Sequence, residues 1–310
     1  MKITFTIDSI LSNKLDGSDS AEHWDTYHLI KEAENRGHDV RMVQSEDAII
    51  GKGFSKELYL NNNKIIYRDF TLPDALMIRG YGMRVGKECF DNLVDTVKSI
   101  EENISLVVNS SSATAYSRKD NQKKLPLPFI PSYDINGEVD VNALLKEHKD
   151  GIILKPVYGL QGNGVEFIKN TTGLENLLRT GAITEDDLKN DYIVEQFIPN
   201  QKEIRHIYLF NERVGSRVAE KIGSPARESL GNRYLLETPN KKHLEIAREA
   251  MDLTGIKYGC IDFRGDYVLE INGSGTQTFY RDKMGSSGKI FLDLNKNIID
   301  KLESNFKKLN

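Results

Sequence analysis

The sequence is poor in the residues that would mark a secreted, metal-stapled or membrane protein. Its two cysteines, Cys89 and Cys260, lie far apart and neither belongs to a Cys-x-x-Cys pair, which argues against a disulfide framework or a zinc site. We interpret both as small core residues. No apolar run approaches the ~18 residues of a membrane helix, and the alternating residues 1–8 predict a first strand and no signal peptide. We therefore expect a cytoplasmic protein.

An excess of charge of one sign is also missing. The chain has 42 Lys and Arg against 46 Asp and Glu, a net charge of −4, and its densest basic cluster is Arg118, Lys119, Lys123 and Lys124. This balance argues against nucleic acid or an anionic membrane as a partner. A length of 310 residues with 39% hydrophobic residues is typical of a globular protein with roughly two or three domains. Whether the chain forms a homo-oligomer is left open.

The first third of the chain has the pattern of a doubly wound α/β domain. An apolar alternation at 3–7, a helical period at 21–35 and an extended run at 39–43 give a strand–helix–strand unit, which is typical of a parallel sheet. Residues 58–67 predict a small hairpin. We assign residues 1–108 to this N-terminal domain.

The remainder is predicted to be α+β, in two subdomains. We assign residues 109–198 to a central subdomain with a glycine-rich loop and residues 199–310 to a C-terminal subdomain. In the C-terminal part the pattern becomes antiparallel, with a hairpin formed by 258–263 and 267–271 and a closing helix at 290–309.

A lysine and a glycine-rich loop follow a predicted strand of the central subdomain. From Lys155 to Val165 the chain carries three glycines, Gly159, Gly162 and Gly164, and runs directly into the next strand. Glycine allows backbone N–H groups to approach phosphate oxygens, and Lys155 supplies a positive charge for them. The loop lacks Gly-Lys-Ser/Thr and a following helix, so it is neither a Walker loop nor a dinucleotide fingerprint. A purely structural hairpin is the alternative.

Three oxygen-bearing side chains converge on the predicted C-terminal hairpin. Glu270 and Asn272 are two apart on a strand and share a face. A three-residue turn at 264–266 would place Asp262 opposite Val268, on that same face. Such a set suits Mg²⁺, a hard cation that also takes phosphate oxygens. The alternative is a solvated polar face, but the neighbouring residues are apolar and a lone buried acid is costly.

A third pattern lies at the end of the predicted strand that begins at Tyr192. It ends in Glu195 and Gln196 and continues through Ile198 as a connection whose backbone groups could face a purine, with the Glu203 carboxylate close enough to take ribose hydroxyls. The alternative is that these side chains form ordinary salt links at a strand end.

The order of the three patterns resembles the ATP-grasp superfamily, from about residue 110 to about residue 275. Within it, the chain is most similar to bacterial glutathione synthetases and to amino-acid ligases that add glutamate to a ribosomal protein. The likeness to glutathione synthetases extends to the N-terminal domain, where residues 19–20 lead into a helix that closes with residues 34–40. Asn109 and Lys119 stand at about that family's spacing for an asparagine and the first ATP-binding lysine.

The resemblance implies an ATP-grasp architecture, in which the two α+β subdomains clamp ATP, and it implies a role for each matched residue. The residues implied for ATP are Lys119 and Lys155 for the α- and β-phosphates, Tyr158, Gly159, Gln161, Gly162 and Gly164 for a loop closing over the γ-phosphate, Glu195, Gln196 and Ile198 for adenine, and Glu203 for ribose. Asp262, Glu270 and Asn272 are implied to hold Mg²⁺, two ions in all, which Mn²⁺ would be able to replace.

The resemblance also implies catalytic and substrate contacts. Arg205 and Lys221 correspond to the cations that steady the transferring phosphoryl group and the tetrahedral intermediate. The implied substrate contacts are Arg227, Asn232, Gly273 and Ser274. Around Asn232 and after Asn272 the sequence differs from the motifs of glutathione synthetases, so we expect different substrate contacts.

The implied function is an ATP-dependent, ADP-forming ligase that makes an amide bond through an acyl phosphate, with an amino acid or a peptide as substrate. Two alternatives stay open. The chain could be a macrocyclase that modifies a ribosomally made precursor peptide, docked on residues 58–67, or a nucleotide-binding module without turnover. Specificity lies in loops, so the sequence names neither the carboxylate nor the amine.

Overall fold

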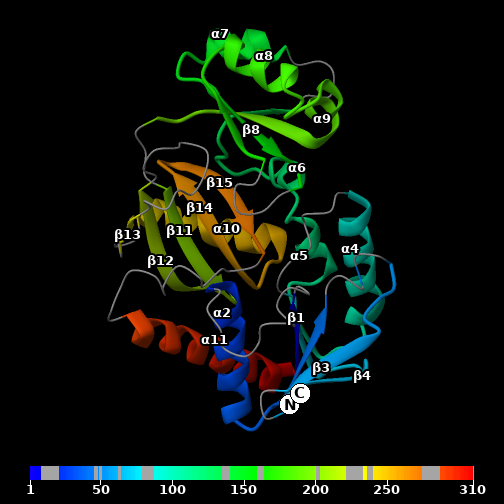
Figure 1. Ribbon diagram of the computed structural model, residues 1–310. Coiled ribbons are helices and arrows are strands. Elements are labelled where there is room, and N and C mark those ends of the chain that lie inside the picture. The colour runs from blue at the N-terminus through cyan, green and yellow to red at the C-terminus, as the bar shows by residue number, and fades with distance from the viewer. Residues whose placement is uncertain are drawn as a thin grey trace.

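The computed structural model describes residues 1–7, 21–44, 48, 51–61, 64–78, 87–134, 140–158, 164–199, 203–220, 233–235, 240–273 and 287–309. Three sheets, each covered by helices, follow one another along the molecule (Figure 1). The four-stranded sheet lies at one end, the six-stranded sheet at the other, and the five-stranded sheet between them. Within the described ranges, none of the helices combines the length and the apolar character needed to cross a bilayer.

The six-stranded sheet is built from the N-terminal part of the chain. Its order is β4-β3-β2-β1-β5-β6, parallel from β2 to β6 and antiparallel at the β3–β4 edge. The elements are β1 (Lys2–Ile7), α2 (Ala21–Asn35), β2 (Asp39–Gln44), β3 (Lys56–Asn61), β4 (Lys64–Asp69), β5 (Ala75–Met77), α4 (Lys87–Glu101) and β6 (Leu106–Val108). The predicted hairpin is therefore present as β3 and β4.

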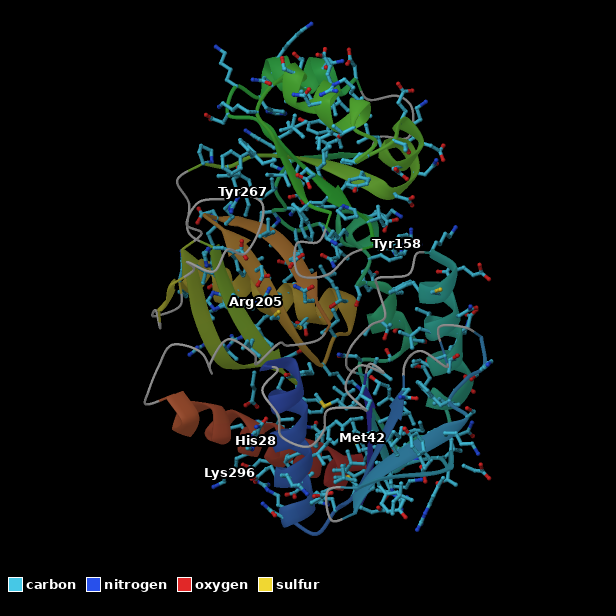
Figure 2. All side chains as sticks on the ribbon, viewed as in Figure 1. His28, Met42, Tyr158, Arg205, Tyr267 and Lys296 are labelled. Carbon is cyan, nitrogen blue, oxygen red and sulfur yellow. The ribbon has the colours of Figure 1, made fainter. Side chains whose placement is uncertain are left out.

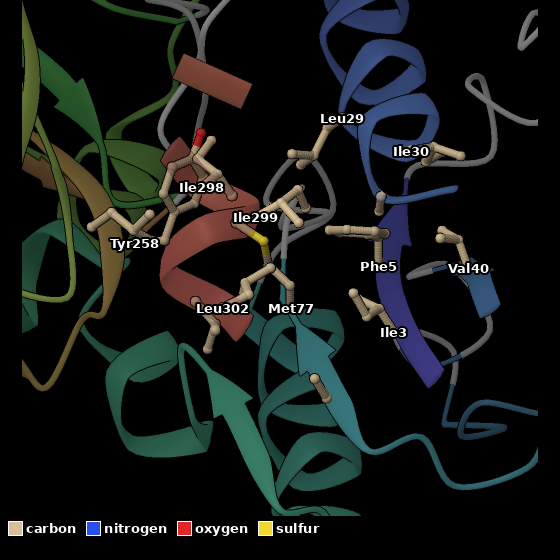
Figure 3. Close-up of a cluster of buried hydrophobic side chains, with 14 of the residues drawn as sticks. Ile3, Phe5, Leu29, Ile30, Val40, Met77, Tyr258, Ile298, Ile299 and Leu302 are labelled. Atoms are coloured by element: carbon tan, nitrogen blue, oxygen red, sulfur yellow. The ribbon is translucent and has the colours of Figure 1, made fainter. Parts of the chain in front are cut away.

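Helices cover both faces of this sheet, as a doubly wound fold requires. Phe5 and its neighbours on β1 pack against Leu29 of α2 and against Ile299 of α11 (Ser287–Leu309), the last helix of the chain (Figure 3). On the opposite face, Leu93 of α4 packs against Leu76. The C-terminal helix thus returns to complete the core of the N-terminal sheet, and the predicted fold class is confirmed.

The four-stranded sheet has the order β7-β10-β8-β9. The chain reaches it through α5 (Ser111–Ala115) and α6 (Lys119–Gln122). Its own elements are β7 (Ser132–Asp134), α7 (Val141–Glu147), β8 (Ile152–Pro156), β9 (Glu166–Ile168), α8 (Thr171–Arg179), α9 (Glu185–Asp191) and β10 (Tyr192–Gln196). Leu154 and Val194 pack with Leu144 of α7 and Leu174 of α8 on one face. Because side chains alternate along a strand, the residues next to Leu154 on β8 and next to Val194 on β10 point to the other face.

The five-stranded sheet has the order β13-β12-β11-β14-β15 and is antiparallel throughout. Its elements are β11 (Glu203–Leu209), β12 (Glu212–Glu220), β13 (Arg233–Leu235), α10 (Lys241–Thr254), β14 (Tyr258–Arg264) and β15 (Tyr267–Asn272). Helix α10 covers one face, where Met251 packs against Ile261 and Phe263. At one end of the opposite face, Cys260 and Ile207 pack in the same core as α11.

The β14–β15 hairpin differs from the predicted register. Asp262 is opposite Glu270 and not Val268, which instead pairs with Phe263. The turn is tighter than expected, since Arg264 already pairs with Tyr267, and a bulge at β15 absorbs the extra residue. Directly paired residues share a face. Asp262 and Glu270 therefore share a face, as expected, and they are directly opposite each other.

One asparagine ties the end of the six-stranded sheet to this hairpin. Asn109, with a φ of 64°, follows β6 and is fully buried. Its Oδ1 accepts from the backbone N–H groups of Lys257 and Tyr258 at 3.0 Å, and its amide donates to the carbonyls of Tyr258, at 2.8 Å, and Gly273. All the hydrogen-bonding groups of the carboxamide are thereby used across a sequence gap of about 150 residues.

The buried face under α10 predicts an acid-sensitive stability. His206 is fully buried, edge-on to Phe263 at 5.6 Å and 5.7 Å from the ring of His243, and burial with these neighbours lowers its pKa to about 4. The unfolded chain, with a pKa near 6.5, takes up this proton first. The contribution is therefore intact above pH 6.5 and is lost as the pH falls towards 4.

We expect this histidine to cost about 2 kcal/mol of unfolding free energy between pH 7.5 and pH 5. Urea unfolding of the wild type and of His206→Gln at both pH values measures it. The variant, which cannot titrate, should lose about 2 kcal/mol less on acidification than the wild type. Equal losses in both proteins would show that His206 is not the acid-sensitive group.

Candidate active site

The inner face of the four-stranded sheet carries a lysine and a glutamate among apolar residues. Lys155 of β8 is opposite Ile193, and Glu195 of β10 is opposite Ile153, so all four share the face that turns away from α7 and α8. Glu195 is 1% exposed and Lys155 8%. Two buried charges on one sheet face need each other or a ligand.

Glu195 lies between two ammonium groups. Lys155 Nζ is 2.5 Å from Oε2 and Lys123 Nζ is 2.7 Å from Oε1, the latter contact close but not aligned as a hydrogen bond. Lys123 also lies 4.7 Å from the centre of the Phe129 ring. Burial alone would raise the pKa of Glu195, but the two lysines reverse the effect and hold this pKa below its usual range. The carboxylate is therefore ionised, and it holds both lysines in place.

Lys123 is a site residue that the sequence reading missed. It stands four positions after Lys119, which places both on one side of a helical turn. It belongs to the basic cluster noted above, whose ordinary interpretation is a solvated surface. Here its side chain is 10% exposed, and burial lowers its pKa.

Lys119 joins the two halves of the site. It begins α6 and is 8% exposed. Burial lowers its pKa, Glu270 of the five-stranded sheet opposes that change most strongly, and Lys155 and Glu195 of the four-stranded sheet act on it as well. A single cation thus feels charged groups from both sheets, which places the two inner faces around one region.

The five-stranded sheet contributes an arginine, two acids and an amide. Arg205 of β11 is opposite Asp262, and Asp262 is opposite Glu270. The guanidinium donates to both oxygens of Asp262, with Nε at 2.5 Å from Oδ1, and lies 3.8 Å from Glu270. The Asn272 amide donates to Glu270 at 2.9 Å. Arg205 is visible on this sheet in Figure 2.

The two acids have opposite pKa directions. Burial, with the Glu270 and Glu203 carboxylates nearby, raises the pKa of Asp262 to about 6 against the pull of Arg205. Burial of Glu270 is outweighed by Lys119, Lys155 and Arg205, which hold its pKa at about 2. Two carboxyl groups on one face, repelling each other without water, are the setting that a divalent cation relieves.

The residues present fit a magnesium ion. In the described part of the chain, no three His, Cys, Asp or Glu residues form a metal cluster. A protein-held ion at the hairpin would therefore need the amide oxygen of Asn272 beside the two carboxylates. Mg²⁺ accepts such a small oxygen set, because it keeps water and phosphate oxygens as its other ligands.

The expected adenine and ribose residues lie at one end of both sheets. The N–H of Gln196 donates to the carbonyl of Pro131, at 3.0 Å, so it is already used. Phe197 packs against Phe167 with a ring separation of 4.8 Å, and the Arg264 guanidinium lies 5.7 Å from the Phe197 ring. Glu203 is 6% exposed and 3.9 Å from Arg264. Ile198 is half-buried beside them in sequence.

Tyr158 is placed against the N-terminal domain. Tyr158 is labelled in Figure 2. Its ring packs 6.1 Å from Phe90 of α4 and lies under the Arg118 guanidinium at 5.1 Å. Gly164 has a φ of 72°, and a Cβ there would come within 3.1 Å of Pro156. Gly273 uses its carbonyl to accept from Asn109. The other expected residues lie outside the described part of the chain: Gly159, Gln161, Gly162, Lys221, Arg227, Asn232 and Ser274.

No protein family model matches the chain. Two curated relatives are glutathione synthetases. That of Anaplasma centrale is 25% identical over 270 residues, which span 79% of this chain and 82% of the relative. That of Nitrosomonas europaea is 24% identical over 344 residues, which span 100% of each. The expected resemblance to glutathione synthetases is therefore found over the whole length.

Solved structures of ATP-grasp ligases superpose on nearly the whole chain. The D-alanine–D-alanine ligase from Bacillus anthracis, complexed with ATP, has a TM-score of 0.62 at 13% identity and covers 100% of both chains. The macrocyclase MdnC from Microcystis aeruginosa, bound with its precursor peptide, has a TM-score of 0.60 at 16% identity over 97% of this chain and 100% of that one. The ATP-grasp ligase PsnB with a minimal precursor, Mg and ADP reaches 0.58 at 16% identity over 97% and 96%. The predicted ATP-grasp fold is confirmed.

The buried Glu195 predicts a large effect of an isosteric change. Glu195→Gln leaves the ammonium groups of Lys123 and Lys155 buried without their carboxylate. Breaking a buried pair in this way costs about 3–5 kcal/mol, so we expect a loss of unfolding free energy of about that size. Urea unfolding without nucleotide measures it. The matched control is Glu175→Gln, an exposed position on α8 that should change stability by less than about 0.5 kcal/mol. Equal stabilities for the two variants would mean that the triad is not energetically coupled.

Proposed function

We propose that this chain is an ATP-dependent ligase that phosphorylates a carboxylate and joins the resulting acyl phosphate to an amine, with release of ADP and phosphate. The observation that carries the proposal is the convergence of Lys119 and the Lys155–Glu195 pair on the acids of the β14–β15 hairpin. Phosphoryl transfer needs such an electrostatic cradle and little covalent chemistry from the protein.

The division of labour follows the two sheets. Lys119 and Lys155 hold the α- and β-phosphates, and the Glu195 carboxylate, which was expected at the adenine pocket, instead pairs with Lys155 and orients it. Gln196 and Ile198 line the adenine pocket. The ribose lies at Glu203. Lys119 is suited to this role, because the negative charge of a phosphate offsets the desolvation that lowers its pKa.

The β14–β15 side handles the charge that develops in the transfer. Asp262, Glu270 and Asn272 would hold the two Mg²⁺ ions implied by the resemblance, which would supply positive charge for the phosphoryl transfer. Arg205 is kept at this side by its pairing with Asp262 and steadies the transferring phosphoryl group. The protein thereby supplies cations from two directions and excludes water by burial.

The substrate is an amino acid or a peptide in this proposal. The similar proteins include a glutathione synthetase and a macrocyclase bound with a precursor peptide. The full-length likeness to glutathione synthetases favours a small-molecule substrate. A second candidate is modification of a precursor peptide, as the neighbour MdnC is named for. The β3–β4 hairpin favours it, since β4 is a sheet edge and Tyr67 of β4 is 54% exposed. The proposal keeps the domain limits 1–108, 109–198 and 199–310 and a cytoplasmic location.

The experiment that tests the function is ADP release from ATP with a panel of amino acids, γ-glutamylcysteine with glycine, and short peptides, with the products read by mass spectrometry. A ligase gives ADP in step with a new amide. A product larger than a dipeptide favours the peptide candidate. Tight ATP binding with no ADP from any combination would mean a binding module and would end the ligase proposal.

The metal assignment predicts a loss of turnover. Asp262→Asn and Glu270→Gln are nearly isosteric, yet each should reduce turnover by ~100-fold or more, the scale of one lost electrostatic stabiliser. Asp266→Asn is the matched control, because this acid lies in the turn of the same hairpin and is exposed, paired only with an exposed lysine, Lys242. If both site variants keep turnover near that of the control, the metal assignment is wrong.

The phosphate assignment predicts a loss of affinity. Lys155→Ala removes a charge-assisted contact worth roughly 1.5–3 kcal/mol, so the dissociation constant for ATP should rise about tenfold to a hundredfold. Calorimetric titration measures it, with Lys149→Ala, an exposed lysine just before β8, as the control. An unaltered constant in Lys155→Ala would place the phosphates elsewhere.

A further inference from the structure

Gln122 makes an unusual set of contacts with the strand that carries Glu270 and Asn272. It is the last residue of α6 and is 2% exposed. Its Nε2 donates to the carbonyl of Ile271 at 2.6 Å, and its Oε1 accepts from the N–H of the same residue at 2.9 Å. A side-chain amide thus pairs with Ile271 as the backbone of a neighbouring strand would. The second hydrogen of Nε2 goes to the carbonyl of Tyr116, at 2.8 Å.

The position of Ile271 gives these bonds their consequence. It lies between Glu270 and Asn272, so its N–H and its carbonyl belong to the two peptide groups that link it to these residues. A hydrogen bond to each peptide group fixes the two planes and with them the Cα–Cβ directions of both side chains. β15 is the last strand of its sheet, and in the described part of the chain its outer edge is bonded at Val268 by the backbone of residues 128–130 and at Ile271 by the Gln122 side chain.

The other end of the same short helix carries Lys119. Gln122 stands three positions after Lys119, and the N–H of Lys123 donates to the carbonyl of Lys119 at 3.2 Å within the turn. After burial, the Lys119 ammonium and the Glu270 carboxylate have the largest influence on each other's pKa. Through Gln122, the single turn of α6 therefore connects Lys119, which is assigned to the phosphates, with β15, the strand that carries Glu270.

We infer that Gln122 is a positioning residue that sets the distance between Lys119 and the Glu270–Asn272 pair, and so the affinity for the metal–nucleotide complex. This inference rests on the proposed function of the site. Residues that orient metal ligands without touching the ion affect metal affinity about 10- to 100-fold. Gln122 acts in this way through the backbone of Ile271.

A purely structural role of Gln122 predicts a different result. If Gln122 only satisfied the edge of β15, its loss would lower stability and leave the metal-dependent part of nucleotide binding unchanged. If it positions the site, metal-free nucleotide binding should change little, because the Lys155 side is intact, while the gain in affinity on adding Mg²⁺ should shrink. The difference between binding with and without Mg²⁺ therefore separates the two roles.

The experiment uses the full chain and a non-hydrolysable ATP analogue, titrated by calorimetry in EDTA and in saturating Mg²⁺. The variants are Gln122→Met, which keeps the size and removes all the polar atoms, and Gln122→Glu, which keeps the Oε1 acceptor and loses both donors. Thr254→Val is the matched control, since it deletes a buried side-chain hydrogen bond to Ala250 on the α10 side of the same sheet. Thermal unfolding of all proteins shows how far each is destabilised.

The expected result is that Mg²⁺ tightens binding strongly in the wild type and in Thr254→Val, and about 10- to 100-fold less in Gln122→Met. Gln122→Glu should lie between the two. A metal effect in Gln122→Met equal to that of Thr254→Val at similar unfolding temperature overturns the inference while leaving the proposed function intact. If the wild type itself binds the analogue equally with and without Mg²⁺, the proposed function fails first.

Should Gln122→Met not fold, Gln122→Glu carries the test alone, together with hydrogen exchange at residues 268–272 in the presence of the analogue and Mg²⁺. Faster exchange in Gln122→Glu than in the wild type, with a reduced metal effect, supports the positioning role. Wild-type exchange and a wild-type metal effect overturn it.

Discussion

Burial of charge between two sheet faces is the constraint on which the site depends. The buried Glu195 carboxylate is flanked by Lys155 and Lys123, and the buried Asp262 has both of its oxygens bound by Arg205. Removing one partner leaves an uncompensated charge, which is far more costly than the pair is stabilising. The faces therefore function as matched sets, and a change at any member is felt by the others.

The fold provides this arrangement through strand alternation and a returning chain. On the four-stranded sheet, Leu154 and Val194 face the helices while Lys155 and Glu195 face inward. On the five-stranded sheet, α10 covers the face opposite Asp262, and α11 continues into the N-terminal core. Each of these two sheets thus has one face packed against helices and one face that carries buried charged side chains. Asn109 and Gln122 hold the hairpin to the segment that carries Lys119.

The sequence predicted the features that depend on local periodicity and order. Glu270 and Asn272 were expected on one face because they are two apart, and the doubly wound start followed from apolar spacing. The register of Asp262 was wrong because a bulge cannot be read from composition, yet the shared face survived since Asp262 pairs directly with Glu270. A prediction that two residues share a sheet face stays correct after a local register shift if both side chains still point to the same side of the sheet.

The features that were missed depend on contacts across long stretches of chain. In the sequence, Lys123 belongs to a basic cluster of the kind that usually lies on the surface. It is buried here because β10 places Glu195 beside it. Gln122 has no signal of its own, because its partner Ile271 is 149 residues away. The short helix α7 and the short strand β13 were also not predicted, since so few residues give little periodicity.

The central claim is that one nucleotide–metal complex lies between the two inner faces. A crystal grown with a non-hydrolysable ATP analogue and Mn²⁺ tests it most directly, because the anomalous signal of manganese locates the ion without reference to the protein. The account predicts a peak within coordination distance of Asp262 and Glu270, with the phosphates reaching Lys119 and Lys155. A nucleotide bound elsewhere, or a metal peak with no ligand on the β14–β15 hairpin, would contradict it.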